Sequence, residues 1–109
     1  MLFKPEHIPM ILNGTKTATR RDWKKPMVKV GNDYPVKTQM LSKETHCRIK
    51  VLKIYKQKLR YMNDKDAFKE GYYFKDFVEI WKKINGKWDG DLEVYVIEFK
   101  LLRGTKHST

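Results

Sequence analysis

The strongest constraint on the fold is a break in the alternation of residues between positions 46 and 58. The odd-numbered positions from Cys47 to Val51 are apolar and the positions between them are basic, but then Leu52 and Ile54 are apolar and Lys53 is not. A shift of one residue in a period-two pattern is typical of a β-bulge. We therefore predict one long strand with a bend near Val51–Leu52. Because such bends help a small sheet to curl on itself, the pattern favours a small barrel.

The other elements are predicted from turn residues and from helical periodicity. The order of elements predicts an α+β fold, a small mixed β-barrel with helices packed on one side, in a single domain over residues 1–109 with its core at 2–102. In the first half of the chain we expect a short strand at 2–4, a helix at 5–13, an extended segment at 16–23, a strand end and turn at 27–33 and an extended piece at 34–38. The bent strand at 46–58 follows. In the second half we expect a capped short helix at 63–71, an amphipathic helix at 74–84, a central buried strand at 92–102 and a frayed tail at 104–109.

The charge of the chain is strongly positive and unevenly distributed. The net charge is +11 over 109 residues, and the part from 1 to 60 carries 15 Lys and Arg against 4 Asp and Glu, whereas the remainder carries 9 against 9. Such asymmetry favours a basic face, for which nucleic acid is the commonest partner. The alternative is a lysine-rich surface that serves solubility or heat stability.

Several classes of protein are disfavoured by what the sequence lacks. Cys47 is the only cysteine, and the histidines at 7, 46 and 107 are too scattered for a zinc site. We therefore expect no metal and no cofactor. No signal-peptide pattern and no apolar run of membrane-spanning length occurs, so we expect a soluble cytoplasmic protein without a membrane partner.

The segment from Gly14 to Arg21 combines three cations with three hydroxyls in eight residues. If it is extended, the period of two places Thr17, Thr19 and Arg21 on one face, and the long side chain of Lys16 can swing over that face. This arrangement suits an anionic or carbonyl-bearing ligand. The alternative is structural, since threonine favours strands and charged residues protect a sheet edge from pairing.

The same segment, Gly14-x-Lys16-x-x-Thr19-x-Arg21, matches the GxKxxTxR signature of ASCH domains, small relatives of the PUA-like RNA-binding barrels. The order of the other elements is also similar to that family, from the apolar helix before the motif to the terminal strand at 94–100. The resemblance covers residues 2–102 and implies a PUA-like fold.

Within this superfamily the chain resembles the small bacterial enzymes that hydrolyse N(4)-acetylcytidine to cytidine and acetate. Those enzymes use a lysine, a threonine and a glutamate, so the resemblance implies Lys16, Thr19 and Glu70 as catalytic residues. A threonine nucleophile needs a base, and Lys16 can serve if burial or neighbouring cations lower its pKa, although an anionic Glu70 would raise that pKa. Other ASCH members are regarded as RNA-binding modules and some as ribonucleases, so non-catalytic RNA binding in the same cleft remains the alternative.

The expected partner is RNA or a modified nucleoside, and further residues are candidates for contacting it. Arg21 would hold a phosphate or stabilise an oxyanion. Four aromatic residues are candidates for stacking on bases, namely Trp23, Tyr34, Tyr72 and Tyr73. The alternative for each aromatic residue is packing in the core. The predicted ligand-binding residues are Thr17, Arg20, Arg21, Trp23, Tyr34 and Tyr72.

Overall fold

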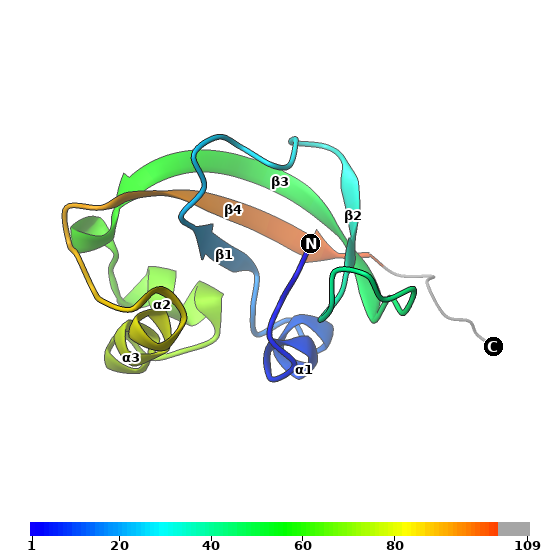
Figure 1. Cartoon of the computed structure of the whole chain (residues 1–109), viewed down its shortest axis with the longest axis horizontal. Coiled ribbons are helices and arrows are strands. Elements are labelled where there is room, and N and C mark those ends of the chain that lie inside the picture. Colours follow the sequence, from blue (N-terminus) through cyan, green and yellow to red (C-terminus); the bar gives the residue numbers. More distant parts are fainter. Residues whose placement is uncertain (103–109) are drawn as a thin grey trace.

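The computed structural model describes residues 1–102 and shows a curled four-stranded sheet with the helices below it (Figure 1). The predicted α+β class is confirmed, and the sheet forms a half-barrel. The elements are α1 (His7–Leu12), β1 (Ala18–Arg21), β2 (Asp33–Val36), β3 (Cys47–Lys58), a 3-10 turn (Leu59–Tyr61), α2 (Asp64–Glu70), α3 (Phe74–Asn85) and β4 (Glu93–Leu101).

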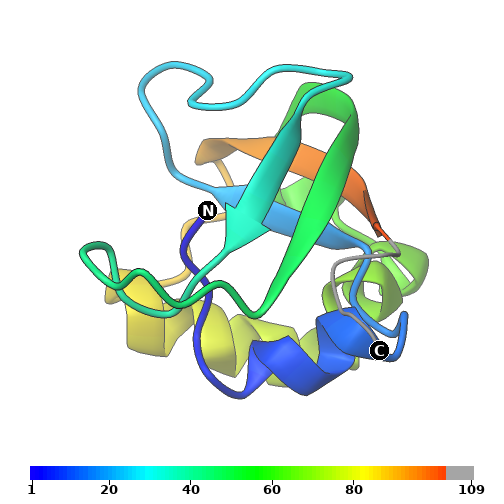
Figure 2. The same cartoon turned by 90° about the vertical axis from the view of Figure 1, so that its right-hand side faces the viewer.

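The strands lie in the order β1-β4-β3-β2, and all neighbours are antiparallel. The register between β3 and β4 shifts between Val51 and Lys53, so Leu52 is the extra residue of a bulge and is exposed. The predicted bend is therefore confirmed. Figure 2 shows its result, with β2 and β3 crossing in front of β1 and β4. The strand predicted to be central, β4, lies between β1 and β3, while β1 is an edge strand.

The buried side chains form three clusters that join the sheet to the segments around it. One links Phe3 and α1 to the β2 end of the sheet, and a second links α2 and α3 to Val94. The third lies where Val28, from the connection between β1 and β2, covers Val51 and Ile97. The edge strand β1 contacts both the helical layer, where Arg20 binds Glu70, and the N-terminal segment, where Arg21 binds the Leu2 carbonyl.

Three predicted extended segments were wrong in detail. Residues 2–4 make only an isolated parallel bridge, Leu2 with Lys37, and β1 ends at Arg21 rather than continuing to residue 23. Residues 27–32 contain the predicted turn but no strand end, and Asp33 already belongs to β2; the backbone groups of Gly31 and Asn32 bond to the carbonyl and the amide of Val51. This connection thus supplies hydrogen-bond partners for the backbone amide and carbonyl of Val51, beside the bulge, instead of pairing as a strand.

The helices also differ slightly from the prediction. Helix α1 begins at His7 rather than at residue 5, since the residues before it form a turn. None of the helices within residues 1–102 is long and apolar enough to cross a membrane. The tail predicted at 104–109 lies outside the described residues.

Candidate active site

A cavity of about 380 Å³ lies between β1, the N-terminal segment, α3 and the turn that joins α2 to α3. This volume is within the range of small-molecule sites. The cavity brings together the three predicted catalytic residues, which come from the chain before β1, from β1 itself and from the end of α2. Its polar lining includes Lys16, Thr19, Arg20, Arg21, Glu70, His7 and Tyr72.

Lys16 is positioned by backbone hydrogen bonds on both sides of it. Its own amide donates to the Met10 carbonyl of α1 (2.9 Å), and the next amide, that of Thr17, donates to the Lys69 carbonyl of α2 (2.7 Å). The close approach of α1 to the end of α2 depends on Gly71, because a Cβ there would lie 2.8 Å from the Met10 sulfur. These contacts fix Lys16 against the end of α2.

Glu70 is the last residue of α2 and is fully buried. The helix begins with a reciprocal capping box between Asn63 and Asp66, and it ends at Gly71, whose positive φ of 99° suits a helix C-terminus. The Glu70 carboxylate accepts from the Lys16 ammonium (3.0 Å) and from the Arg20 guanidinium (2.9 Å). Two buried cations therefore share one carboxylate, as a buried anion requires.

The Lys16 ammonium has three acceptors, one for each of its protons. Its Nζ donates to the Ala18 carbonyl (2.9 Å), to the Glu70 carbonyl (3.2 Å) and to the Glu70 carboxylate (3.0 Å). Burial lowers the pKa of Lys16 from its ordinary value, and this effect outweighs the raising effect of Glu70. The neutral amine is therefore easier to form here than on the surface.

Arg20 and Arg21 occupy opposite faces of the sheet, and both reach the cavity because β1 is an edge strand. Arg20, opposite Val96 in the register, also donates to the Gln57 side chain (2.8 Å). The expectation that Lys16 would lie over the face of Thr19 and Arg21 was wrong, since its ammonium binds Glu70 together with Arg20. Both cations are attracted to the same buried carboxylate, which explains why the Lys16 ammonium lies beside Arg20 and not over Thr19.

Thr19 is held by the second arginine. The Arg21 Nε donates to the Thr19 hydroxyl oxygen (3.0 Å), and its Nη2 donates to the Leu2 carbonyl (2.7 Å). Thr19 is buried at the base of the cavity, and its hydroxyl proton remains available for donation. No hydrogen bond joins Lys16 Nζ to Thr19 within the described part of the chain.

The sequence interpretation missed His7, which lies in the cavity wall. Its Nε2 is 2.8 Å from the hydroxyl oxygen of Tyr72, a predicted ligand contact that also lines the cavity. Burial, followed by the charge of Lys16, lowers the pKa of His7 to about 4, so the ring is neutral at pH 7. The spacing of four between His7 and the buried Ile11 was the signal that places this ring on the inner face of α1.

Thr17, Trp23 and Tyr34 lie outside the cavity lining. The Thr17 carbonyl accepts from the Phe99 amide, and the Tyr34 hydroxyl accepts from the Lys29 amide. Trp23 packs on Tyr95 of β4, with ring centroids 6.4 Å apart. Over residues 1–102, no three His, Cys, Asp or Glu side chains are grouped so as to hold a metal ion.

The fold and the motif agree with a comparison against protein families. The family model for the ASCH domain matches residues 3–103, nearly the whole chain. The chain belongs to the ASCH domain family. A search of curated proteins finds no match.

Solved structures support this ASCH fold. The chain is similar to the ASCH domain from Lactobacillus crispatus JV V101 (17% identity, TM-score 0.60, covering 86% of this chain and 69% of that one). It is also similar to protein EF3133 from Enterococcus faecalis V583 (14% identity, TM-score 0.64, covering 95% and 76%). A third similar structure is the hypothetical protein PH0355 (18% identity, TM-score 0.66, covering 92% and 94%). At these identities the likeness concerns the ASCH fold alone.

Proposed function

We propose that this ASCH domain is an amidohydrolase that removes an acyl group from the exocyclic amide of a modified nucleoside, as in the conversion of N(4)-acetylcytidine to cytidine and acetate. The observation that carries the proposal is the convergence of Lys16, Thr19 and Glu70 on one cavity of nucleoside size. Glu70 lies 54 positions after Lys16 in the sequence, and the three residues match the residue types on which the related deacetylases depend.

In the proposed reaction the Thr19 hydroxyl oxygen attacks the amide carbonyl carbon, and neutral Lys16 accepts the hydroxyl proton. The tetrahedral oxyanion forms beside Arg21, whose guanidinium already contacts Thr19. When the C–N bond breaks, the Lys16 ammonium returns the proton to the departing amine of cytidine. Lys16 then takes a proton from a water molecule, which attacks the acyl-threonine ester. When the ester C–O bond breaks, acetate leaves and the Lys16 ammonium returns the proton to the Thr19 oxygen.

The reaction requires Lys16 to leave at least one of its three present acceptors. The Ala18 carbonyl is uncharged, so the amine can turn from it towards Thr19 while the charged Glu70 carboxylate holds it. Catalytic hydrogen bonds often form only when substrate is bound. Glu70 thus acts as a positioning residue that fixes the amine, and burial keeps the pKa of that amine low.

The direct test is release of acetate from N(4)-acetylcytidine by the purified protein. We expect turnover by the natural chain and its loss in Thr19→Val, which keeps the side-chain shape but removes the hydroxyl. Thr45→Val, in the exposed loop before β3, is the matched control and retains turnover. Absence of acetate release by the natural chain would contradict the proposal.

A second candidate function is RNA binding without catalysis, which is favoured by the concentration of positive charge in residues 1–60. A free nucleoside carries no phosphate, so turnover of N(4)-acetylcytidine should depend little on salt. RNA binding should weaken steeply as salt is added. Salt-sensitive RNA binding by a protein that releases no acetate would favour this second function.

A further inference from the structure

A row of aromatic and cationic side chains leads out of the cavity across one face of the sheet. By register, Arg21 of β1 lies opposite Tyr95 of β4, and Tyr95 lies opposite Lys56 of β3. Phe3 and Trp23 flank Arg21 on the same face. We call these five residues the aromatic–cation ladder.

Each neighbouring pair in the ladder is in contact. The Arg21 guanidinium carbon lies 4.8 Å from the centre of the Phe3 ring and 5.9 Å from that of Trp23. Trp23 packs on Tyr95, and the Lys56 ammonium lies 5.3 Å from the centre of the Tyr95 ring. Since Phe3 and Arg21 also line the cavity, the ladder is continuous with the candidate active site.

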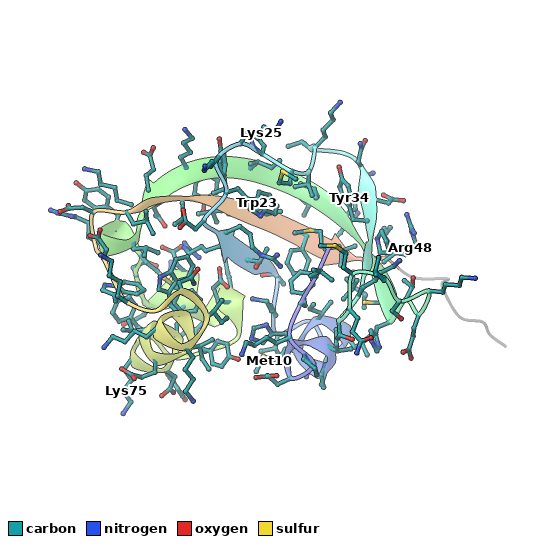
Figure 3. The ribbon with its side chains drawn as sticks, viewed as in Figure 1. Met10, Trp23, Lys25, Tyr34, Arg48 and Lys75 are labelled. Carbon is teal, nitrogen blue, oxygen red and sulfur yellow. The ribbon has the colours of Figure 1, made fainter. Side chains whose placement is uncertain are left out.

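The outer part of the ladder is accessible. The Lys56 side chain is 54% exposed, and Trp23 and Tyr95 are half-buried. Figure 3 shows Trp23 where the chain leaves β1, against β4, with Lys25 farther out on the same connection. The acid near Lys56 is Glu93, at 4.0 Å and equally exposed, so that pair contributes little and leaves the ammonium available.

We propose that the aromatic–cation ladder is a binding track for a single-stranded polynucleotide whose target base occupies the cavity. This inference rests on the proposed function for the position of the target base. Flanking bases stack on Trp23 and Tyr95, and Lys56 together with the exposed lysines that follow Trp23 neutralises their phosphates. Aromatic faces beside a basic groove are the arrangement by which proteins bind single strands.

On the opposite face the Lys53 ammonium lies 5.1 Å from the centre of the Tyr55 ring, but the lysines at positions 50 and 100 of that face lack such a contact within residues 1–102, so Lys50 supplies a matched control. There Lys50 of β3 lies opposite Lys100 of β4, but no aromatic ring is stacked with either ammonium in the described part of the chain. If positive charge alone were responsible for binding, Lys50 and Lys56 would contribute equally. If the ladder is the track, Lys56 contributes more.

The test is fluorescence anisotropy with a labelled single-stranded oligonucleotide, in RNA and DNA forms, at several salt concentrations. We expect Trp23→Leu to weaken binding roughly fivefold or more with an unchanged salt slope, because it removes stacking. We expect Lys56→Ala to reduce the salt slope by about one, because it removes a phosphate contact. The comparison of RNA with DNA identifies which sugar the track prefers.

The controls are Phe68→Leu, which removes an exposed aromatic ring from α2, and Lys50→Ala; both should bind as the natural chain does. Equal losses in Trp23→Leu and Phe68→Leu, or equal salt slopes in Lys56→Ala and Lys50→Ala, would overturn the track, as would no binding at low salt. Lys56 is exposed, so its variant is informative even if Trp23→Leu fails to fold. Acetate release from free N(4)-acetylcytidine is measured separately, so a failed track and a failed hydrolase remain distinguishable.

Discussion

The Lys16 ammonium binds both the backbone carbonyl and the side-chain carboxylate of Glu70, a residue 54 positions later in the chain. This double contact joins the segment before β1 to the end of α2 at the base of the cavity. Arg20 binds the other carboxylate oxygen from β1. The same group of buried charges therefore fixes the fold and shapes the candidate site.

Glu70→Gln should destabilise the protein strongly, because it leaves two buried cations without their shared anion. Removing one partner of a buried charge pair costs about 3–5 kcal/mol. Urea unfolding measures the change in the free energy of unfolding. Glu79→Gln is the control, since the Glu79–Lys82 pair on α3 is exposed and should contribute less than about 0.5 kcal/mol. Similar losses in the two variants would contradict a structural role for the buried group.

The proposed hydrolase activity should rise with pH, because the proposed base is the neutral amine of Lys16. Burial lowers the pKa of this residue, so the rise should be centred below the ordinary value of 10.5. Lys16→Arg keeps the charge but removes the base, and should abolish acetate release at every pH. Lys43→Arg, in an exposed loop, should retain the natural profile. A profile that rises nowhere below pH 10.5 would rule out Lys16 as the base.

His7 should make the fold sensitive to acid. Its pKa is about 4 in the folded chain, whereas the ordinary value is 6.5, so the unfolded chain binds the proton more readily. The free energy of unfolding should therefore fall as pH falls from 6.5 to 4, by up to about 3 kcal/mol. His7→Gln should flatten this part of the stability curve relative to the natural chain. His46→Gln, in which an exposed ring is replaced, should leave the curve unchanged.

The bulge and the central strand were predictable because they depend on local patterns. A one-residue slip near Val51 identifies a bulge whatever surrounds it, and the two apolar faces of β4 require burial on both sides. The position of the segment at 27–33 was not predictable, since its turns depend on backbone bonds to Val51 of a distant strand. Strand periodicity does not report such long-range bonds.

The candidate site was predictable to a lesser degree. The motif and the family resemblance brought Lys16, Thr19 and Glu70 to attention, and all three line one cavity. The reach of its long side chain, however, led us to expect Lys16 over the face of Thr19, whereas the buried carboxylate draws it to Arg20. The contact of His7 with Tyr72 was missed because it joins α1 to the turn after α2, two segments 65 residues apart.

Gly71→Ala tests how closely α1 and α2 must approach each other beside the cavity. A non-glycine residue with positive φ costs about 1–2 kcal/mol, and at Gly71 the added methyl group would also meet the Met10 sulfur at 2.8 Å. Gly14→Ala is the control, because Gly14 has a φ of 82° but nothing within 4 Å of the added carbon. We expect Gly71→Ala to lower the free energy of unfolding by more than Gly14→Ala does.

Because a methionine side chain is flexible, part of the clash between Met10 and the added methyl group is relieved by its movement. Truncating it in the double variant Met10→Ala/Gly71→Ala should remove the excess loss, and a double-mutant cycle in chemical denaturation measures that coupling. Additive losses would mean that backbone strain at Gly71, and not its contact with α1, accounts for the whole effect.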